Sequence, residues 1–268
     1  MNEKDTAILS AVKRIVSLVP SITESVCRLG MTKRLVGVTD YCVRPAAPLE
    51  KVARVGGPKD PSVKKILALK PDLVLASDEE NEESDVMKLL DGGIEVRVAR
   101  VRSVADAFKM MRFLADISPE SERAHRYITE MERVCEDVRK NAAGANVRTA
   151  CLLWRFGDGQ AEAYTTCNGE TYTSDLVSMM GGKNVFAGLN KKYSKVTPTD
   201  IEKRRPDLIL LPTEPYYFRR RDVRELSETL NCPAARNRNV RIVNGRLLVW
   251  YGTALLDGVK TLAPLFRR

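Results

Sequence analysis

Short runs of aliphatic and β-branched residues alternate along the chain with segments in which apolar residues recur every three or four positions. The first pattern indicates buried strands and the second indicates amphipathic helices. The strand-like runs are "KRIVSLV", "RLVGV", "DLVLAS" and "IEVRVA" in the first half, then "RTACLLWRF" and "DLILLP" in the second. This alternation predicts an α/β fold with parallel sheets that carry helices on both faces.

One stretch in the first half has a counterpart in the second. "LALKPDLVLAS", residues 67 to 77, matches "KRRPDLILLPT", residues 203 to 213, in its basic-Pro-Asp-Leu start and in the aliphatic run that follows. The strands that open each half begin near Arg14 and Arg148, at almost the same spacing. Two related Rossmann-like lobes explain both repeats. In each copy we expect the proline to end a short helix and the aspartate to turn the chain into a buried strand, which is a structural role.

A long amphipathic segment lies between the two halves. Apolar residues recur at helical spacing through "RAHRYITEMERVCEDVRK", with Pro119 before the segment and Gly144 after it. The pattern predicts one connecting helix over 119–143, roughly 35 Å long at 1.5 Å per residue. The predicted domains are therefore an N-terminal α/β lobe over 1–118, this helix, and a C-terminal α/β lobe over 144–268.

Composition and charge narrow the classes of partner. Lys and Arg number 44 against 35 Asp and Glu, so the net charge is +9, but the excess is diffuse and lacks interleaved aromatic residues. We therefore expect no nucleic-acid binding. No apolar run is long enough to span a bilayer, so we expect no membrane insertion, and we expect a monomer. The start "MNEKDTAILSAVKR" does not resemble an export signal. As sequenced the chain is expected in the cytoplasm, or in the periplasm or another extracytoplasmic space if a leader was removed.

The residue types used in catalysis and metal binding are sparse. The six cysteines form no C-x-x-C pair, so we expect free thiols and no zinc site. "GDGQAE", residues 157 to 162, lacks the third glycine of a dinucleotide fingerprint and is interpreted as a turn. The single histidine, His125, lies on the connecting helix and is interpreted as a surface residue. We expect no catalytic residues and no metal ligands from the protein.

Charged clusters follow each copy of the repeat. Six acidic residues crowd into residues 78–85 after the first copy, and Arg219, Arg220 and Arg221 follow the second. The acidic cluster is interpreted as charge at the start of a helix, which the helix dipole favours, with an acidic docking patch as the alternative. The three arginines are interpreted as a solvated face.

Aromatic residues gather at or just beyond the predicted strand ends, where open α/β sheets place their ligands. They are Tyr41, Trp154, Tyr172, Tyr216, Tyr217, Trp250 and Tyr251. Such rings suit a large, flat and partly apolar ligand. In "VWYG" the two adjacent rings point to opposite sides of an extended chain, so both cannot enter the same core.

Six segments, in order along the chain, carry a resemblance to a known family: "RIVSLVPSITESVCRLG", "RLVGVTDYC", "ILALKPDLVLAS", "MMGGKNVF", "RRPDLILLPTEPYYF" and "VWYG". In these segments the chain resembles the class III, helical-backbone family of periplasmic binding proteins, of the vitamin B12 and siderophore receptor type. The resemblance implies two α/β lobes joined by a single long helix, a ligand cleft between the lobes and little hinge motion. The lack of an export signal makes the chain similar to the leaderless branch of the family assigned to cobalamin.

The resemblance also implies a set of site residues. The ligand-binding set is Pro20, Ser21, Tyr41, Cys42, Trp154, Thr166, Cys167, Tyr172, Trp250 and Tyr251. Receptors of importers dock through an acidic residue on each lobe, and Glu82 and Glu83 are the implied docking residues on the first lobe. The arginines at 219–221 stand where the second lobe would need an acid, which weakens the expectation of an ABC-type permease partner. An aromatic residue of the family near "RVGGPKD" is missing, which leaves the ligand open.

The leading hypothesis is a non-enzymatic solute-binding protein that holds a corrinoid, cobalamin-like ligand, with no catalytic cofactor. The alternatives are a ferric siderophore or haem as the ligand. A different class is an enzyme or cofactor-handling protein that acts on a bound metal complex, for which Cys42 would be the reactive group. A third is an interaction module that uses the acidic face at 78–85.

Overall fold

The computed structural model describes residues 12–267, which divide into two compact units. The first unit contains the described residues up to Val101, together with Ala105–Met131 and Tyr251–Thr253. The second contains Arg102–Val104, Glu132–Trp250 and the described residues from Ala254 onward. The division thus falls inside the long helix that was predicted to connect the lobes. The expectation about an export signal concerned the first residues of the chain, of which 1–11 lie outside the described residues.

The first unit is built on a five-stranded sheet in the order β3-β2-β1-β4-β5, and every strand pair in it is parallel. Its strands are β1 (Ile15–Ser17), β2 (Leu35–Val38), β3 (Ala53–Arg54), β4 (Leu73–Ser77) and β5 (Val96–Ala99). The strands are short and their central members are buried on both faces, as the continuous aliphatic runs predicted.

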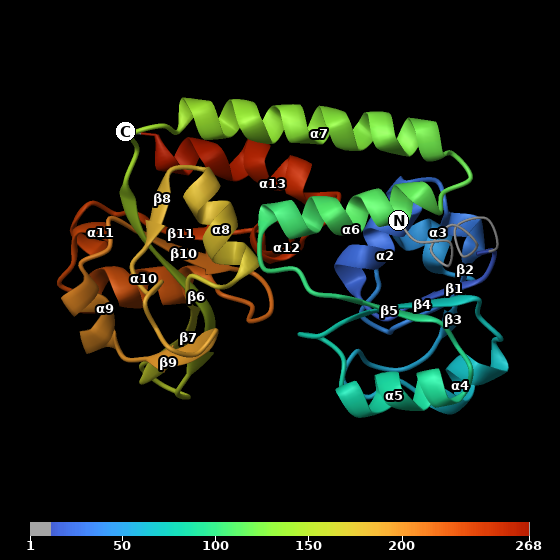
Figure 1. Cartoon of the computed structure of the whole chain (residues 1–268). Helices are drawn as coiled ribbons and strands as arrows, with labels where there is room; N and C mark the ends of the chain where they lie inside the picture. Colours follow the sequence, from blue (N-terminus) through green and yellow to red (C-terminus); the bar gives the residue numbers. More distant parts are fainter. Residues whose placement is uncertain (1–11, 268) are drawn as a thin grey trace. The chain divides into compact units, whose positions relative to one another are not determined.

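Helices cover both faces of this sheet (Figure 1). They are α2 (Pro20–Arg28), η1 (Thr32–Arg34), α3 (Ala46–Leu49), α4 (Val63–Ala68), α5 (Glu83–Asp91) and α6 (Val104–Asp116). α4 and α5 lie on one face, where Ile66 and Leu89 pack against Val74 and Ala76 of β4, and α2 and α6 lie on the other. α2 begins three residues earlier than the Thr23 start expected from the pattern, because Pro20 takes the first helical position, where its missing N–H costs nothing.

The second unit is built on a six-stranded sheet in which β8 pairs with β6 off the main order β11-β10-β6-β7-β9. Its strands are β6 (Val147–Phe156), β7 (Ala163–Cys167), β8 (Gly182–Asn184), β9 (Tyr193–Val196), β10 (Leu208–Pro212) and β11 (Val240–Val243). β6, β8, β10 and β11 are parallel, but β7 and β9 are antiparallel to their neighbours. The expectation of parallel strands alone was therefore incomplete here. β6 has ten residues, enough to run past its parallel partners and fold back through the "GDGQAE" turn.

Helices pack the second sheet into a separate core. They are α7 (Ser121–Asn141), α8 (Tyr172–Met179), α9 (Pro198–Arg204), α10 (Arg220–Thr229), α11 (Pro233–Arg236), α12 (Gly245–Val249), α13 (Ala254–Leu262) and η2 (Ala263–Phe266). Ile201 of α9 and Leu226 of α10 pack with Ile209 and Leu211 of β10. Of α7, the part up to Met131 clusters with the first unit and the rest with the second.

The repeated Pro-Asp-Leu stretch does the same structural work in both units. Asp72 accepts hydrogen bonds from the backbone N–H groups of Lys13 and Arg14, both at 2.8 Å, and so joins the amino ends of β1 and β4. Asp207 accepts in the same way from the N–H of Arg148 at 3.1 Å, and joins β6 to β10. The residue before each proline, Lys70 or Arg205, has a positive φ of 46° or 47°. The aspartates therefore set strand pairing at the amino edge, the sheet edge opposite the one where ligands bind.

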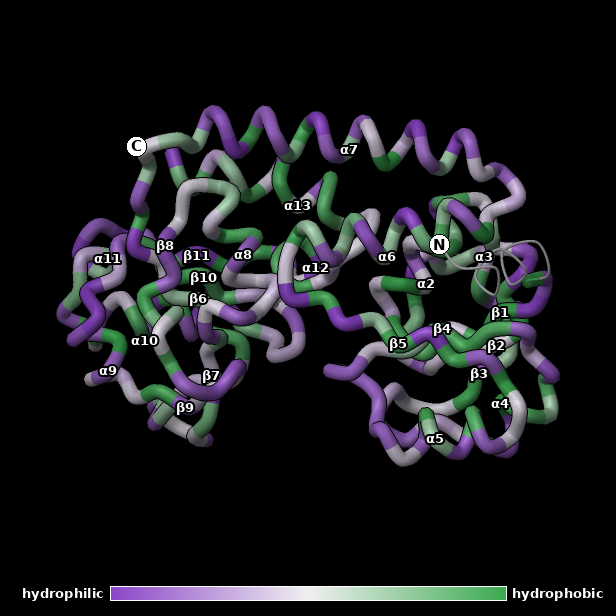
Figure 2. Tube along the Cα trace, in the orientation of Figure 1, coloured by the Kyte–Doolittle hydropathy of each residue, from purple (hydrophilic) through white to green (hydrophobic). Residues whose placement is uncertain are grey.

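α7 is a 21-residue helix, slightly shorter than the predicted range 119–143. Hydrophilic and hydrophobic residues alternate along this helix, whereas hydrophobic residues, drawn in green, are concentrated in strands such as β10 (Figure 2). His125 on this helix is paired with Asp116 at 2.9 Å and is partly exposed, in agreement with a surface role. Within residues 12–267, every helix is too short or too polar to cross a membrane.

Candidate functional site

The strand order of the first sheet reverses between β1 and β4, and ligands of open α/β sheets bind at the carboxyl ends of strands at such a point. Pro20 and Ser21 follow β1 and are both buried at the start of α2. Tyr41 and Cys42 follow β2 at the same edge of the sheet. Tyr41 is 65% exposed, so its ring faces solvent from this edge. Arg54 holds the loop by donating to the carbonyl oxygens of Thr39 and Cys42 at 2.8 and 2.9 Å.

Cys42, in contrast, is fully buried below the loop. Its Sγ lies 3.1 Å from the hydroxyl oxygens of both Thr23 and Thr39. Burial raises the pKa of the Cys42 thiol, and the hydrogen bonds from the two threonines only partly offset this. The thiol therefore stays protonated at neutral pH, which is the unreactive form of a cysteine.

Tyr251 belongs to the first unit although it lies near the end of the sequence. Its side chain is buried, its hydroxyl lies beside those of Ser21 and Ser77, and burial raises the pKa of its phenol. The next residue, Gly252, has a φ of +81°, and a Cβ there would lie 2.2 Å from Oγ of Ser25. That same Oγ accepts a hydrogen bond from the N–H of Thr253 at 3.1 Å. Gly252 thus allows the segment to lie close against α2, and Tyr251 completes the polar carboxyl edge of the first sheet.

Glu80 stands in the turn after β4, beside this group of hydroxyls. Its side chain is partly buried, and burial together with the neighbouring Glu79 raises the pKa of its carboxyl to about 7, although Lys59 acts in the opposite direction. A carboxyl with this pKa exchanges its proton near neutral pH, and groups of this kind gather at functional sites.

The raised pKa of Glu80 predicts a pH-dependent effect of Glu80→Gln on stability. Between the usual carboxyl pKa of 4.5 and the folded value of about 7, the unfolded chain loses this proton while the folded protein keeps it. Stability is therefore full below pH 4.5 and falls as the pH rises through this window. We expect wild type and variant to be nearly equal at pH 4.5, and the variant to be more stable at pH 8 by about 1–3 kcal/mol, at 1.36 kcal/mol per pKa unit. Urea unfolding of wild type and variant at the two pH values measures the difference in their free energies of unfolding. The same difference at pH 4.5 and at pH 8 would contradict the prediction.

The second sheet reverses its parallel strand order between β6 and β10, and aromatic rings stand at the carboxyl edge there. Trp154 of β6 is 43% exposed, and its ring lies 5.5 Å from that of Tyr216 in an edge-to-face arrangement. Tyr216 in turn contacts buried Phe218 at 4.7 Å. The exposed indole of Trp154 thus packs on a row of rings that leads into the core, and the edge-to-face arrangement is one that aromatic pairs favour.

Trp250 lies at the end of α12 in the second unit and is partly exposed. Its indole N–H donates to the carboxylate of Glu214 at 3.1 Å, which fixes the orientation of the ring. Tyr217 is 64% exposed, with the guanidinium of Arg219 5.6 Å from its ring centre. The hydrogen-bond donor of Trp250 is therefore satisfied within the protein, and the apolar part of its ring can contact a ligand.

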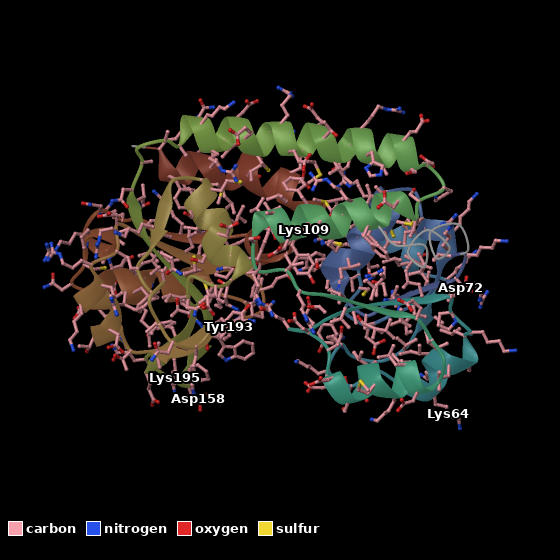
Figure 3. All side chains as sticks on the ribbon, viewed as in Figure 1. Lys64, Asp72, Lys109, Asp158, Tyr193 and Lys195 are labelled. Atoms are coloured by element: carbon pink, nitrogen blue, oxygen red, sulfur yellow. The ribbon has the colours of Figure 1, made fainter. Side chains whose placement is uncertain are left out.

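Sequence reasoning missed Tyr193, an exposed ring on β9 that pairs with Cys167 of β7. Figure 3 labels Tyr193, whose side chain stands clear of the ribbon. The segment "KKYSKV" was not predicted as a strand, because its apolar and polar residues alternate only weakly. Its strand also joins the sheet only through β7, which was not predicted either. The pairing places Tyr193 next to the region around Thr166 and Cys167 that the resemblance had implied.

Three other residues of the implied ligand set are buried within the second unit. Thr166 donates its hydroxyl hydrogen to the carbonyl oxygen of Cys151 at 2.7 Å. Cys167 is fully buried, and so is Cys151, whose thiol pKa is raised by the contact with Cys167 and by burial. Tyr172 begins α8 and is buried, which raises the pKa of its phenol. These three side chains lie inside the second unit and are shielded from solvent.

Arg155, next to Trp154, is the centre of a buried ion network that the sequence did not reveal. Its guanidinium lies 3.3 Å from Oδ1 of Asp222 and 3.0 Å from Oε2 of Glu225, both on α10. It also donates to the carbonyl oxygens of Gly157 and Gly159 in the turn after β6. The network therefore ties the strand that carries Trp154 to α10 and to the turn. No local pattern marks it, because its members are about 70 positions apart.

Among the described residues, no three His, Cys, Asp or Glu side chains are grouped to hold a metal ion. All six cysteines are described, and none of them forms a disulfide. Two surface hollows of about 340 and 250 Å³ lie against the last and first turns of α7, away from both carboxyl edges. The candidate site therefore rests on strand topology and on the exposed rings.

Comparisons with known proteins agree with this architecture. Residues 15–247 match the family described as "Periplasmic binding protein". The vitamin B12-binding protein of Pectobacterium carotovorum subsp. carotovorum (strain PC1) is 28% identical over 212 residues, which cover 78% of this chain and 75% of that protein. The structure of the vitamin B12 binding protein BtuF of Vibrio cholerae has a TM-score of 0.80 at 23% identity, over 95% of this chain and 96% of that one. The heme-binding protein RhuT from Roseiflexus sp. RS-1 has a TM-score of 0.79 at 21% identity, over 96% and 98%. At these identities the structural likenesses show the fold.

Proposed function

Because this chain belongs to the periplasmic binding protein family, we propose that it is a solute-binding protein that holds a corrinoid, cobalamin-like chelate without changing it chemically. The observation that carries the proposal is the set of exposed aromatic rings at the carboxyl edges of both sheets. An exposed ring costs free energy in water, and a broad apolar ligand removes that cost. The sequence relatives named for vitamin B12 binding support the corrinoid as the first ligand to test.

We assign direct ligand contact to the implied site residues whose rings are exposed or partly exposed. These are Tyr41 in the first unit and Trp154 and Trp250 in the second, to which the structure adds Tyr193 and Tyr217. The buried members of the implied set have a supporting role. They are Pro20, Ser21, Cys42 and Tyr251 in the first unit and Thr166, Cys167 and Tyr172 in the second, all of which are buried.

The protein is proposed to bind the chelate through its periphery and not through its metal. His125 is engaged with Asp116 on a helix surface, and the described residues offer no cluster of metal-binding side chains at either carboxyl edge. A cobalt corrinoid would therefore keep its own axial ligands. A haem that needs a histidine from the protein is the less favoured alternative, and a ferric siderophore remains the other alternative ligand.

The alternative of chemistry at Cys42 receives no support from its surroundings. A reactive cysteine needs an exposed thiol with a lowered pKa, whereas Cys42 is buried and the pKa of its thiol is raised. Binding without reaction is the simpler proposal.

We propose that the protein works with a permease in an extracytoplasmic location, as is usual for the family, but that the second docking surface is basic. Glu82 and Glu83 stand exposed at the start of α5, and Glu82 is paired with Lys59 at 3.1 Å. The exposed start of α10 carries Arg219, Arg220 and Arg221 instead of acids. A permease that docks on both surfaces would need basic groups opposite the first and acidic groups opposite the second. Family membership favours the extracytoplasmic location among those considered from the sequence.

Co-elution in gel filtration tests the proposed function. The purified protein is incubated with an excess of cyanocobalamin, passed through the column, and monitored for protein and for corrinoid absorbance. We expect an equimolar amount of corrinoid in the protein peak. The same run with hemin and with a ferric siderophore separates the alternative ligands. A protein peak free of every chelate would contradict the proposal.

A further inference from the structure

The turn after β4 places one acidic side chain at the point where the first sheet reverses its strand order. β4 ends at Ser77 beside β1, and the turn that follows runs to Asn81. Asn81 accepts a hydrogen bond from the N–H of Ser77 at 2.8 Å and donates one to the carbonyl oxygen of Pro58 at 2.8 Å. The N–H of Glu79 donates to Oγ of Ser77 at 3.2 Å. The turn is therefore held at both ends, and Glu80 within it has a fixed backbone position at the carboxyl edge.

Four titratable or charged groups face Glu80 from the surrounding elements. Glu79 lies in the same turn, and Lys59 comes from the loop after β3. Cys42 comes from the loop after β2, and Tyr251 from the segment joined to this unit. Lys59 is also engaged elsewhere, since its ammonium pairs with Glu82 at 3.1 Å and donates to the carbonyl oxygen of Glu79.

Charged groups of both signs lie at the carboxyl edge around Glu80. The acidic ones are Asp40, Asp60, Asp78, Glu79, Glu82 and Glu83, and the basic ones are Arg44, Arg54, Lys59, Arg100 and Arg102. The two that act on Glu80 itself are Glu79 and Lys59, and Lys59 is also paired with Glu82. A ligand carboxylate placed beside Glu80 therefore meets like charge from ionised Glu80 and from Glu79, even though the chain as a whole has a net charge of +9.

We propose that Glu80 is a specificity-determining residue that discriminates between chelates by the charge of their periphery, favouring those that carry amide groups over those that carry carboxylates. The inference deepens the proposed function and rests on it. An amide can donate a hydrogen bond from its N–H to the ionised Glu80, or accept one at its carbonyl oxygen from the neutral carboxyl, so it is satisfied in either state. A carboxylate of the ligand cannot donate, and beside ionised Glu80 and Glu79 it meets like charge in a partly desolvated place.

Corrinoids and haem differ in this property, which makes them suitable ligands for the test. The side chains of the corrin ring in cyanocobalamin end in amides, apart from the one that carries the phosphodiester of the nucleotide loop, whereas the porphyrin ring of hemin carries two carboxylates. Because Glu80 has a pKa of about 7, its repulsion of hemin should grow as the pH rises through that value. The affinity for cyanocobalamin should change little over the same range.

Equilibrium titrations of the full chain with cyanocobalamin and hemin, followed by tryptophan fluorescence at pH 6 and pH 8, test the proposal. We expect Glu80→Gln to bind hemin about tenfold more tightly than wild type at pH 8, which corresponds to about one pKa unit of interaction, and to lose most of the pH dependence. Its affinity for cyanocobalamin should stay within about threefold of wild type, the scatter that a neutral change in contacts allows. Glu95→Gln is the matched control, because it removes the same charge from an exposed position before β5, at the opposite edge of the sheet.

The outcomes separate the two proposals. Failure of wild type to bind either chelate would remove the proposed function, and the selectivity proposal with it. If wild type binds but Glu80→Gln shifts neither ligand, shifts both equally, or behaves like Glu95→Gln, the proposed function stands and the selectivity proposal is wrong. Glu80→Ala guards against a local effect of the glutamine amide, since it should produce the same shift in favour of hemin. Urea unfolding of each variant at both pH values checks that the fold is intact.

Discussion

Replacement of Arg155 by methionine is expected to lower the free energy of unfolding by about 3–5 kcal/mol, the usual cost of removing one partner from a buried ion pair. Methionine keeps most of the length and apolar volume of arginine, so the loss of stability comes mainly from removing the charged guanidinium group. Asp222, which is 1% exposed, would keep only the longer contact to the exposed Arg221 at 4.0 Å, and Glu225 would lose its pairing with Arg155. The carbonyl oxygens of Gly157 and Gly159 would lose their donor as well.

Urea unfolding at neutral pH measures this change, with Arg139→Met as the matched control. Arg139 forms an ion pair with Glu136 at 3.0 Å on the exposed side of α7, and such pairs contribute about 0–1 kcal/mol. A loss below about 1 kcal/mol in Arg155→Met, within the range of an exposed pair, would show that the network does not hold the strand of Trp154 in place.

Replacement of Trp250 by alanine is expected to weaken cyanocobalamin binding by about 10- to 100-fold, which corresponds to about 1.4–2.8 kcal/mol. A tryptophan buries 150–250 Å² when a partner covers it, roughly the largest area that one side chain can supply. The hydrogen bond to Glu214 holds the ring before the ligand arrives, so little rotamer entropy is lost on binding. Titration of the variant and of wild type with cyanocobalamin measures the ratio of dissociation constants.

Two further variants show whether this effect comes from the ring itself. Trp250→Phe keeps an aromatic surface without the indole N–H, and it should lie between wild type and the alanine variant. Tyr127→Ala removes a partly exposed ring from α7 and should leave the affinity unchanged. If Trp250→Ala binds cyanocobalamin as tightly as wild type while keeping its fold, Trp250 is not a ligand contact.

The general plan of this protein could be predicted from local patterns. Strand and helix patterns, the repeated Pro-Asp-Leu stretch and the long amphipathic segment each depend on residues close in sequence. They led to two sheets, helices on both faces and one long helix, as the structure has them. The repeated aspartates were assigned a structural role, and Asp72 and Asp207 do join strands at the amino edges.

Other features depend on contacts between distant residues, and no local pattern encodes them. The run "RTACLLWRF" nearly matched the length of β6, but no pattern predicted that the chain folds back after it into the antiparallel β7 and β9. In the sequence, Arg155 was only a charged residue within a predicted strand, because its partners on α10 are about 70 residues away. Tyr251 was grouped with Trp250 by adjacency, yet it packs beside Ser21 and Ser77 in the other unit. Of the implied ligand-binding set, Tyr41 and Trp154 have exposed rings whereas Cys42 is buried, and the sequence offered no means of separating the exposed residues from the buried ones.

The proposal that exposed rings at the two carboxyl edges hold a broad metal chelate is tested most directly by calorimetric titration of the purified chain with cyanocobalamin. The account predicts saturable binding with one corrinoid per chain and a negative heat-capacity change, the mark of apolar surface leaving water. Absence of any binding heat at several temperatures, for cyanocobalamin and equally for hemin and a ferric siderophore, would contradict it.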